Sequence, residues 1–172
     1  HEYWVNEIKE MKIAIKVAKY LLEKEYKDIL ITSNTPSSEF IFKESGLNGV
    51  DHCYLPFDFF FATKKFVKSV SASLLIIIET EIWPNLYHSC KKNKTNIITI
   101  NGRFNPPQGL LGLMSKKLYI STLDKIDHIY CKSQKDVSAF KDYIDESKIS
   151  LTGNIKHSLV SSDVDTERIV DK

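Results

Sequence analysis

The stretch that decides the fold reads Leu74-Leu75-Ile76-Ile77-Ile78-Glu79-Thr80-Glu81-Ile82-Trp83-Pro84-Asn85. Its five consecutive apolar residues lack polar alternation, which is typical of a strand buried on both faces of a parallel sheet. Two carboxylates follow directly, and Pro84 then fixes the backbone in a turn. Because open α/β sheets bind ligands at the carboxyl ends of their strands, the sequence predicts a site at this edge.

Apolar and β-branched runs recur along the rest of the chain and predict further buried strands. The six predicted strands are Ile29–Thr32, Cys53–Leu55, Leu74–Ile78, Ile97–Ile100, Ile129–Cys131 and Ile149–Thr152, and Tyr3–Val5 is read as the remnant of an earlier strand. Helical spacing of apolar residues separates the runs. The predicted helices are Glu7–Lys24, Ser38–Ser45, Asp58–Ser69, Pro84–Lys92, Leu110–Asp124 and Gln134–Ile144, with Asp58 and Ser133 as N-caps.

This alternation of strands and helices predicts an α/β fold, a Rossmann-like parallel sheet with helices on both faces. The 172 residues are 42% hydrophobic and 27% charged, which suits one domain with a hydrophobic core. A formal net charge of +2 gives no indication of nucleic-acid binding.

The sequence predicts neither a metal nor a cofactor. Cys53, Cys90 and Cys131 are odd in number and lack C-x-x-C spacing, and the five histidines do not cluster at ligand spacings. There is no G-x-G-x-x-G after a strand, no P-loop and no G-x-S-x-G elbow. The carboxylates, amides and hydroxyls that remain at the predicted sheet edge suit a sugar or polyol, with Arg103 and Lys156 as cations.

Several motifs resemble one known family. Glu79–Asn85 is similar to the ETELWPN signature of the 3-deoxy-D-manno-octulosonic acid (Kdo) transferases, which attach Kdo to lipid A in Gram-negative bacteria. Six further segments resemble family motifs in the same order: His1–Glu7 (HxxSxGE), Thr32–Ser38 (TTTTPTG), Tyr54–Asp58 (YLPxD), Asn101–Phe104 (NARL), Ser133–Asp136 (AQ-x-x-D) and Gly153–His157 (GNLKFD). The first is a partial match, because Trp4 and Asn6 stand where Ser and Gly are expected.

The resemblance implies the amino-terminal half of a GT-B glycosyltransferase. Residues 1–157 are then the acceptor-side Rossmann-like domain and 158–172 the start of an interdomain linker, with a membrane anchor expected before the chain and a donor domain after it. The implied partners are a lipid A precursor as acceptor, CMP-Kdo bound through the carboxy-terminal domain, and the inner membrane, at its cytoplasmic face. No stretch of the chain reaches the roughly 18 apolar residues of a membrane span.

The resemblance also implies roles for particular residues. Glu7, predicted in the first turn of its helix, is the general base of an inverting transfer, and Glu79 and Lys156 stabilise the transition state. The residues expected to bind the acceptor are Thr35, Glu81, Asn101 and Arg103. Two alternatives remain open: a related transferase that uses another activated sugar, and a Rossmann-like binding domain that has lost catalysis.

One further segment departs from the family. Phe60 and Phe61 replace a typical Pro and Asp, and they precede Lys64, Lys65 and Lys68. These rings are either part of the core or an exposed surface that enters a lipid headgroup region.

Overall fold

The computed structural model describes residues 2–106 and 109–153, and the side chains of all of these except 2–8 and 110–113. Its strands are parallel and alternate with helices, which confirms the predicted α/β class. The chain divides into two compact units, one reaching Leu55 and the other running from Pro56 to Ile155. The described strands form one sheet of two and one of four, where the sequence predicted one sheet.

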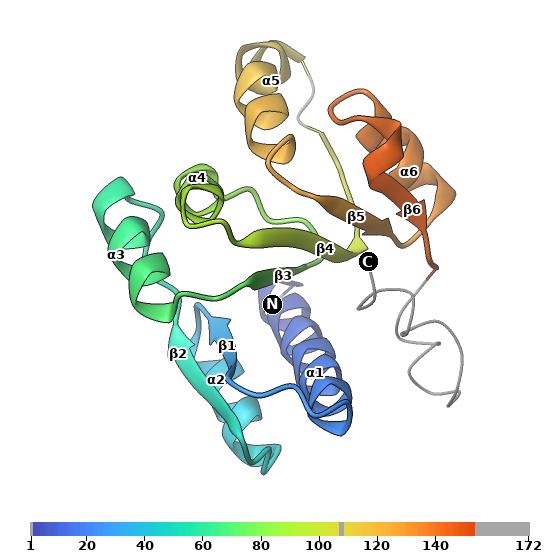
Figure 1. The fold of residues 1–172 in the computed structure, drawn as a ribbon. Coiled ribbons are helices and arrows are strands. Elements are labelled where there is room, and N and C mark those ends of the chain that lie inside the picture. The colour runs from blue at the N-terminus through green and yellow to red at the C-terminus, as the bar shows by residue number, and fades with distance from the viewer. Residues whose placement is uncertain (1, 107–108, 154–172) are drawn as a thin grey trace. The chain divides into compact units, whose positions relative to one another are not determined.

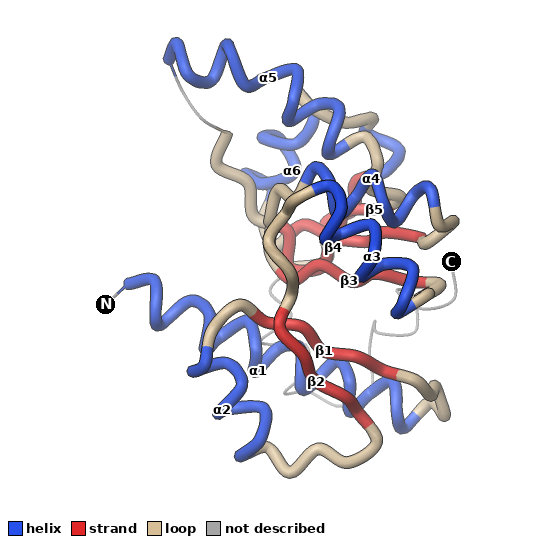
Figure 2. The backbone as a smooth tube through the Cα atoms, turned by 90° about the vertical axis from the view of Figure 1, so that its left-hand side faces the viewer, coloured by secondary structure: helices blue, strands red, loops and turns tan. Residues whose placement is uncertain are grey.

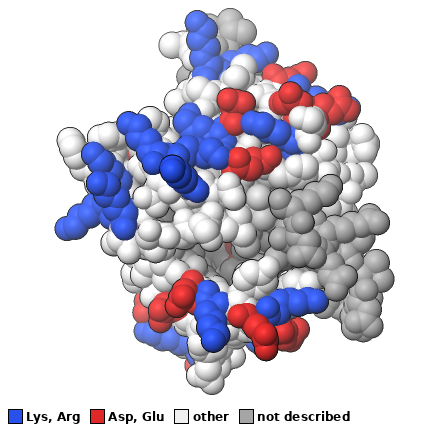
Figure 3. Space-filling view, in the orientation of Figure 1, with Lys and Arg blue, Asp and Glu red and all other residues white. Residues whose placement is uncertain are grey.

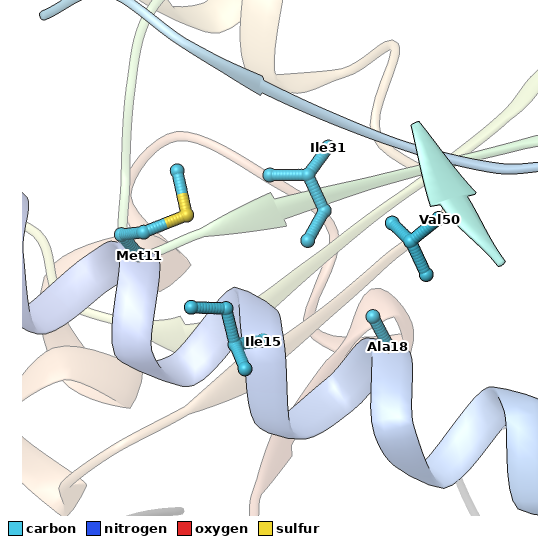
Figure 4. Close-up of a cluster of buried hydrophobic side chains, with 5 residues drawn as sticks. All are labelled: Met11, Ile15, Ala18, Ile31 and Val50. Atoms are coloured by element: carbon cyan, nitrogen blue, oxygen red, sulfur yellow. The ribbon is translucent and has the colours of Figure 1, made fainter. Parts of the chain in front are cut away.

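The first unit contains α1 (Glu2–Glu23), β1 (Ile29–Ser33), α2 (Pro36–Glu44) and β2 (Val50–Tyr54). Its strands pair in parallel from Ile29–Val50 to Ser33–Tyr54, and Figure 2 shows them side by side. The core of the unit joins α1 to the strands. Figure 4 shows its five buried side chains, which are Met11, Ile15 and Ala18 of α1, Ile31 of β1 and Val50 of β2.

The start of α1 corrects two predictions. Tyr3–Val5 is helical and not a strand, and α1 begins at Glu2 and not at Glu7. No Pro or Gly interrupts the chain from Glu2 to Glu23, so the helical pattern extends through the short apolar run that resembled a strand.

The second unit contains α3 (Phe60–Val70), β3 (Leu74–Ile78), α4 (Pro84–Lys92), β4 (Asn96–Gly102), α5 (Gly109–Leu123), β5 (His128–Cys131), α6 (Gln134–Lys141), a 3-10 turn (Glu146–Lys148) and β6 (Ile149–Leu151). The order of its parallel strands is β3-β4-β5-β6, so each strand lies beside the next strand in the sequence. Successive right-handed crossovers that move in one direction place their helices on one face of a sheet. Figure 1 shows α4, α5 and α6 on the same side of these strands.

The face under these helices is the most deeply buried part of the second unit. Ile77, Ile97, Thr99 and Ile129 occupy neighbouring register positions and are buried. At the carboxyl end of β5, Phe140 of α6 stacks on Phe104, with 4.8 Å between the ring centroids. The second unit is therefore well packed beneath the ends of β3, β4 and β5, where the motif residues lie.

Candidate functional site

The backbone turns sharply where β3 ends at Glu79. This residue has a φ of 62°, in the left-handed region that non-glycine residues rarely adopt. Its N–H donates to the carbonyl of Ile100 across 2.9 Å, which extends the β3–β4 pairing to the turn. A strained residue held by such pairing is typical of functional sites, and it directs the Glu79 side chain away from the path of the strand.

The neighbouring strand β4 has an irregularity at the same level. Thr99 pairs with Ile129 and Gly102 pairs with Cys131, so three steps along β4 match two along β5. This β-bulge contains Asn101, which is also left-handed, with a φ of 54°. Bulges of this kind re-aim side chains beside active sites, and asparagine tolerates the conformation better than most residues.

Asn101 is fully buried and contacts Glu79 directly. Its Nδ2 donates to Glu79 Oε1 across 3.3 Å. Its Oδ1 has no hydrogen-bond partner among the described residues. An unpaired buried acceptor costs roughly 1–3 kcal/mol, so the fold spends stability to place this amide beside the Glu79 carboxylate.

A side chain at Gly102, the next residue in the bulge, would be crowded. A Cβ at this position would lie 3.0 Å from Ile129 Cγ2 and 3.3 Å from the carbonyl oxygen of Tyr130. Glycine therefore relieves the contact between β4 and β5 at this point.

The segment after the bulge is held on both sides. The N–H of Arg103 donates to Thr80 Oγ1, and the N–H of Phe104 donates to Asp136 Oδ1, each across 3.2 Å. Ser133, the N-cap predicted for α6, accepts from the N–H of Asp136. These contacts join three predicted motifs at one edge of the sheet and leave the Arg103 side chain exposed.

Glu81 has a different environment from Glu79. Its Oε2 accepts from the indole N–H of Trp83 across 3.0 Å, and its carbonyl accepts from the hydroxyl of Tyr87. Burial raises the pKa of Tyr87, so this phenol stays a hydrogen-bond donor at physiological pH. The loop between β3 and α4 is therefore held by Trp83 at its end and by Tyr87 of α4.

Asp58 corrects a third prediction. It does not cap α3, which begins after Phe59 without a side-chain cap. Instead, its carboxylate accepts from the N–H of Asn85 across 3.1 Å and from the N–H of Leu86 across 2.8 Å, at the start of α4. The Asn85 side-chain amide donates to the carbonyl of Asp58 across 2.6 Å. Asp58 thereby supplies the cap that Trp83 does not provide, because the Trp83 side chain makes no capping bond.

The first unit carries its own polar group at the carboxyl ends of β1 and β2. Ser33 Oγ lies 2.9 Å from His52 Nε2, and the Tyr54 hydroxyl donates to Glu39 Oε2. Hydrogen bonds from Lys43 and Tyr54 hold the pKa of Glu39 below its usual range, whereas burial lowers the pKa of His52. Thr35 caps α2, where its Oγ1 accepts from the N–H of Ser38 across 3.4 Å.

The structure thus brings four predicted site residues together in the second unit, namely Glu79, Glu81, Asn101 and Arg103. Glu7 and Thr35 belong to the first unit, where Glu7 lies in the second turn of α1 and not the first. Lys156 lies outside the described residues. Sequence reasoning missed Thr80 as an anchor of Arg103, although its position inside the Glu79–Asn85 motif was a signal for it.

The arrangement of polar groups at this edge suits recognition of a hydroxylated ligand. In the described parts of the chain, no group of three or more His, Cys, Asp or Glu side chains is placed to hold a metal ion. Carboxylate, amide, hydroxyl and guanidinium groups at the carboxyl edge of a parallel sheet define an α/β ligand-binding domain.

Comparison with known proteins identifies the family. The family described as "3-Deoxy-D-manno-octulosonic-acid transferase (kdotransferase)" matches residues 7–159, and the chain belongs to it. The chain is 29% identical over 150 residues to a 3-deoxy-D-manno-octulosonic acid transferase of Haemophilus influenzae, an alignment that covers 83% of this chain and 34% of that protein.

Two further relatives agree. A 3-deoxy-D-manno-octulosonic acid transferase of Rickettsia conorii is 27% identical over 170 residues, covering 96% of this chain and 36% of that protein. A bifunctional glycosyltransferase/methyltransferase of Fusobacterium nucleatum is 26% identical over 166 residues, covering 91% of this chain and 25% of that protein. The chain therefore spans about a third or less of the length of these relatives.

Proposed function

We propose that this chain is the acceptor-side domain, residues 1–157, of a GT-B glycosyltransferase that transfers Kdo from CMP-Kdo to a lipid A precursor in lipopolysaccharide biosynthesis. The observation that carries the proposal is the joined pair of left-handed residues, Glu79 and Asn101, inside a chain of this family. A fold alone does not determine a function. A carboxylate on a strained backbone, held by a buried amide, is a more specific chemical feature.

The reaction needs one base and a means of stabilising charge. An acceptor hydroxyl attacks the anomeric carbon of Kdo, the bond from that carbon to the phosphate oxygen of CMP breaks, and the hydroxyl proton passes to a carboxylate. Attack from the face opposite the leaving group inverts the anomeric centre. We assign Glu7 as the proton acceptor.

Glu79 and Lys156 serve the transition state in this proposal. The anomeric carbon gains oxocarbenium character as the leaving phosphate gains negative charge. The Glu79 carboxylate stabilises the positive charge, and the Lys156 ammonium stabilises the negative charge. The bond from Asn101 Nδ2 keeps Glu79 in one orientation before the substrate arrives. Such preorganisation avoids rearrangement during the reaction.

The acceptor is held by Thr35, Glu81 and Arg103 in this scheme, and the buried Asn101 contributes by holding the Glu79 carboxylate. The exposed guanidinium of Arg103 suits an anionic group of a lipid-linked sugar, because its planar fork binds phosphate oxygens in pairs. CMP-Kdo is bound by a second domain, and the enzyme works at the cytoplasmic face of the inner membrane. No helix in the described residues has the length and hydrophobicity needed to cross a membrane.

A transfer assay tests the proposal. The enzyme that contains this chain is incubated with a lipid A precursor and CMP-Kdo, or with CMP-sialic acid as a competing donor, and the lipid product is analysed by mass spectrometry. We expect the mass of the lipid to increase by one or more Kdo units when CMP-Kdo is the donor, and to stay unchanged with CMP-sialic acid. Transfer only from the other donor supports the related-transferase alternative, and no transfer from either supports a binding domain without catalysis.

A further inference from the structure

Four phenylalanine side chains form an exposed patch just before and at the start of α3. Phe57, Phe59 and Phe61 are 80%, 71% and 81% exposed, and Phe60 is 40% exposed. The ring centroids of Phe57 and Phe59 are 6.3 Å apart, and those of Phe60 and Phe61 are 5.4 Å apart. Single exposed apolar side chains are ordinary, but contiguous ones mark interaction surfaces. We call these four residues the phenylalanine cluster.

Lysines follow this cluster on α3, and the one carboxylate within it, that of Asp58, accepts from backbone N–H groups at the start of α4. Lys64, Lys65 and Lys68 lie on α3, and neither α3 nor α4 contains Asp or Glu. The Lys64 ammonium lies 5.8 Å from the centroid of the Phe60 ring. Figure 3 shows Lys and Arg side chains gathered at its upper left, where Figure 1, in the same orientation, shows α3 and α4.

A cavity of about 140 Å³ lies between α3 and α4, next to the phenylalanine cluster. Its lining includes Phe60, Lys64, Lys68, His88, Lys92 and Asn93. In the described part of the chain, none of these three lysines pairs with a carboxylate. Several ammonium groups around one small cavity repel each other unless an anion lies among them. The three lysines in its lining therefore favour an anionic group at this cavity.

We infer that the α3–α4 surface docks on an anionic lipid bilayer, with lipid phosphates at the lysine-lined cavity and the phenylalanine cluster inserted among the headgroups. Aromatic rings beside lysines are the combination by which peripheral proteins bind such surfaces. A nucleic acid is the less suitable partner, since the basic residues form a compact patch around four rings, in a chain with a net charge of only +2. This inference deepens the proposed function and rests on it, because a lipid-linked acceptor is the reason for the enzyme to bind a bilayer.

Vesicle sedimentation tests the inference. The protein is mixed with vesicles of phosphatidylcholine and phosphatidylglycerol, or of phosphatidylcholine alone. We expect binding to the anionic vesicles only, weakened about fivefold for each lysine removed, so that Lys64→Gln with Lys68→Gln loses at least tenfold. Phe57→Ser with Phe61→Ser should also release the protein, and the high exposure of both rings makes their removal safe for the fold.

Matched controls carry the same chemical changes elsewhere. Lys27→Gln with Lys135→Gln removes two exposed lysines, and Phe40→Ser removes a ring that is 64% exposed on α2. These variants should bind vesicles like the unchanged protein. If the cluster and cavity variants keep full vesicle binding while their circular dichroism and melting are unchanged, the inference is wrong. Tighter binding of a single-stranded RNA, lost in the same variants and not displaced by vesicles, would also overturn it.

Transfer with detergent-solubilised acceptor separates this inference from the proposed function. A cluster variant that transfers normally in detergent but no longer binds vesicles supports the docking surface. If neither the variants nor the unchanged protein transfer Kdo, the proposed function fails. The docking surface still stands in that case if vesicle binding depends on the phenylalanine cluster and the lysines.

Discussion

Asn101 Nδ2 donates to Glu79 Oε1 across 3.3 Å, and both residues have left-handed backbone at the ends of adjacent parallel strands. The pair joins the turn after β3 to the bulge in β4. Glycine would adopt the backbone conformation of Glu79 more easily, but glycine has no carboxylate to accept the bond from Asn101.

The backbone strain at Glu79 can be measured by comparing two substitutions that both remove the carboxylate. Glycine accepts a positive φ, whereas alanine does not, so Glu79→Gly should be more stable to urea than Glu79→Ala by about 1 kcal/mol. At Lys65, in helix α3, the same comparison should have the opposite sign. An alanine variant at position 79 that equals or exceeds the glycine variant in stability would show that Glu79 is unstrained.

The three carboxylates should respond differently to amide substitution in the enzyme. Glu7→Gln cannot accept a proton, so turnover should fall by about two to four orders of magnitude with donor affinity nearly unchanged. Glu79→Gln should also lose turnover, by roughly two orders of magnitude, because charge is removed at the transition state. Steady-state kinetics with purified variants measures both effects, and near-normal turnover of Glu7→Gln would remove it as the base.

Glu81→Gln is the structural comparison for these variants. The Glu81 carboxylate accepts from the Trp83 indole, and Gln keeps an oxygen acceptor for this bond but removes the charge that strengthens it. The substitution should therefore lower the free energy of unfolding by about 1 kcal/mol, with a smaller effect on turnover than Glu79→Gln. Urea denaturation and the same kinetic assay test the two parts. Equal losses of turnover at positions 79 and 81 would contradict the distinction.

The chain from residue 1 to 172 should not bind CMP-Kdo on its own, since the proposal places the donor in another domain. Isothermal titration calorimetry of this chain with CMP-Kdo should show no appreciable heat of binding. The unfolding transition of the same sample provides the control that the protein is folded. Clear micromolar binding would overturn the assignment of this domain to the acceptor side.

Asp58 should stabilise α4 from outside that helix. Asp58→Ala removes the acceptor for two backbone N–H groups and should lower the free energy of unfolding by about 1–2 kcal/mol. Asp51→Ala, an exposed aspartate of β2, should change it by less than about 0.5 kcal/mol. Adding Asn85→Ala should cost less in the Asp58→Ala variant, because the 3.4 Å contact between Asn85 Nδ2 and Asp58 Oδ2 is then already lost and only the bond to the Asp58 carbonyl remains. Full additivity would contradict the coupling.

Cys131 should make stability depend on alkaline pH. Burial raises the pKa of this thiol to about 12, above its value in the unfolded chain, so the folded state holds the proton more tightly. The resulting stability is complete below about pH 8.5 and is lost as pH rises toward 12. Between pH 8.5 and 12, the free energy of unfolding should fall less steeply with pH in Cys131→Ala, by up to about 1.4 kcal/mol per pH unit. An unchanged slope in this variant would exclude the Cys131 thiol as the cause of the pH dependence.

The sequence predicted the elements whose signals are local. The structure has β3 and α4 with the predicted bounds, since an unbroken apolar run and a proline at the first helical position need no distant partner. Ser133 was also predicted as a cap from its neighbours alone. The approximate place of Glu79 and Asn101, at neighbouring strand ends, followed from the parallel topology.

The features that were missed depend on pairing between distant segments. The bulge at Asn101 exists only relative to the register of β5, and Asp58 caps a helix that begins 26 residues later. Neither relationship leaves a periodic pattern. The start of α1 was misplaced for another reason, because a short apolar run carries no period that separates strand from helix.

The strand order of the second unit also bears on how it assembles during synthesis. A chain leaves the ribosome from its amino terminus, and here every strand pairs with its immediate successor. Pairing of β3 with β4 therefore needs nothing that is translated after Gly102, and each later strand extends an existing template. The last strand among the described residues, Ile149–Leu151, is three residues long, and within that part of the chain it pairs with β5 alone. It is the strand that can detach at least cost, so amide hydrogen exchange should begin at this edge and reach β4 last.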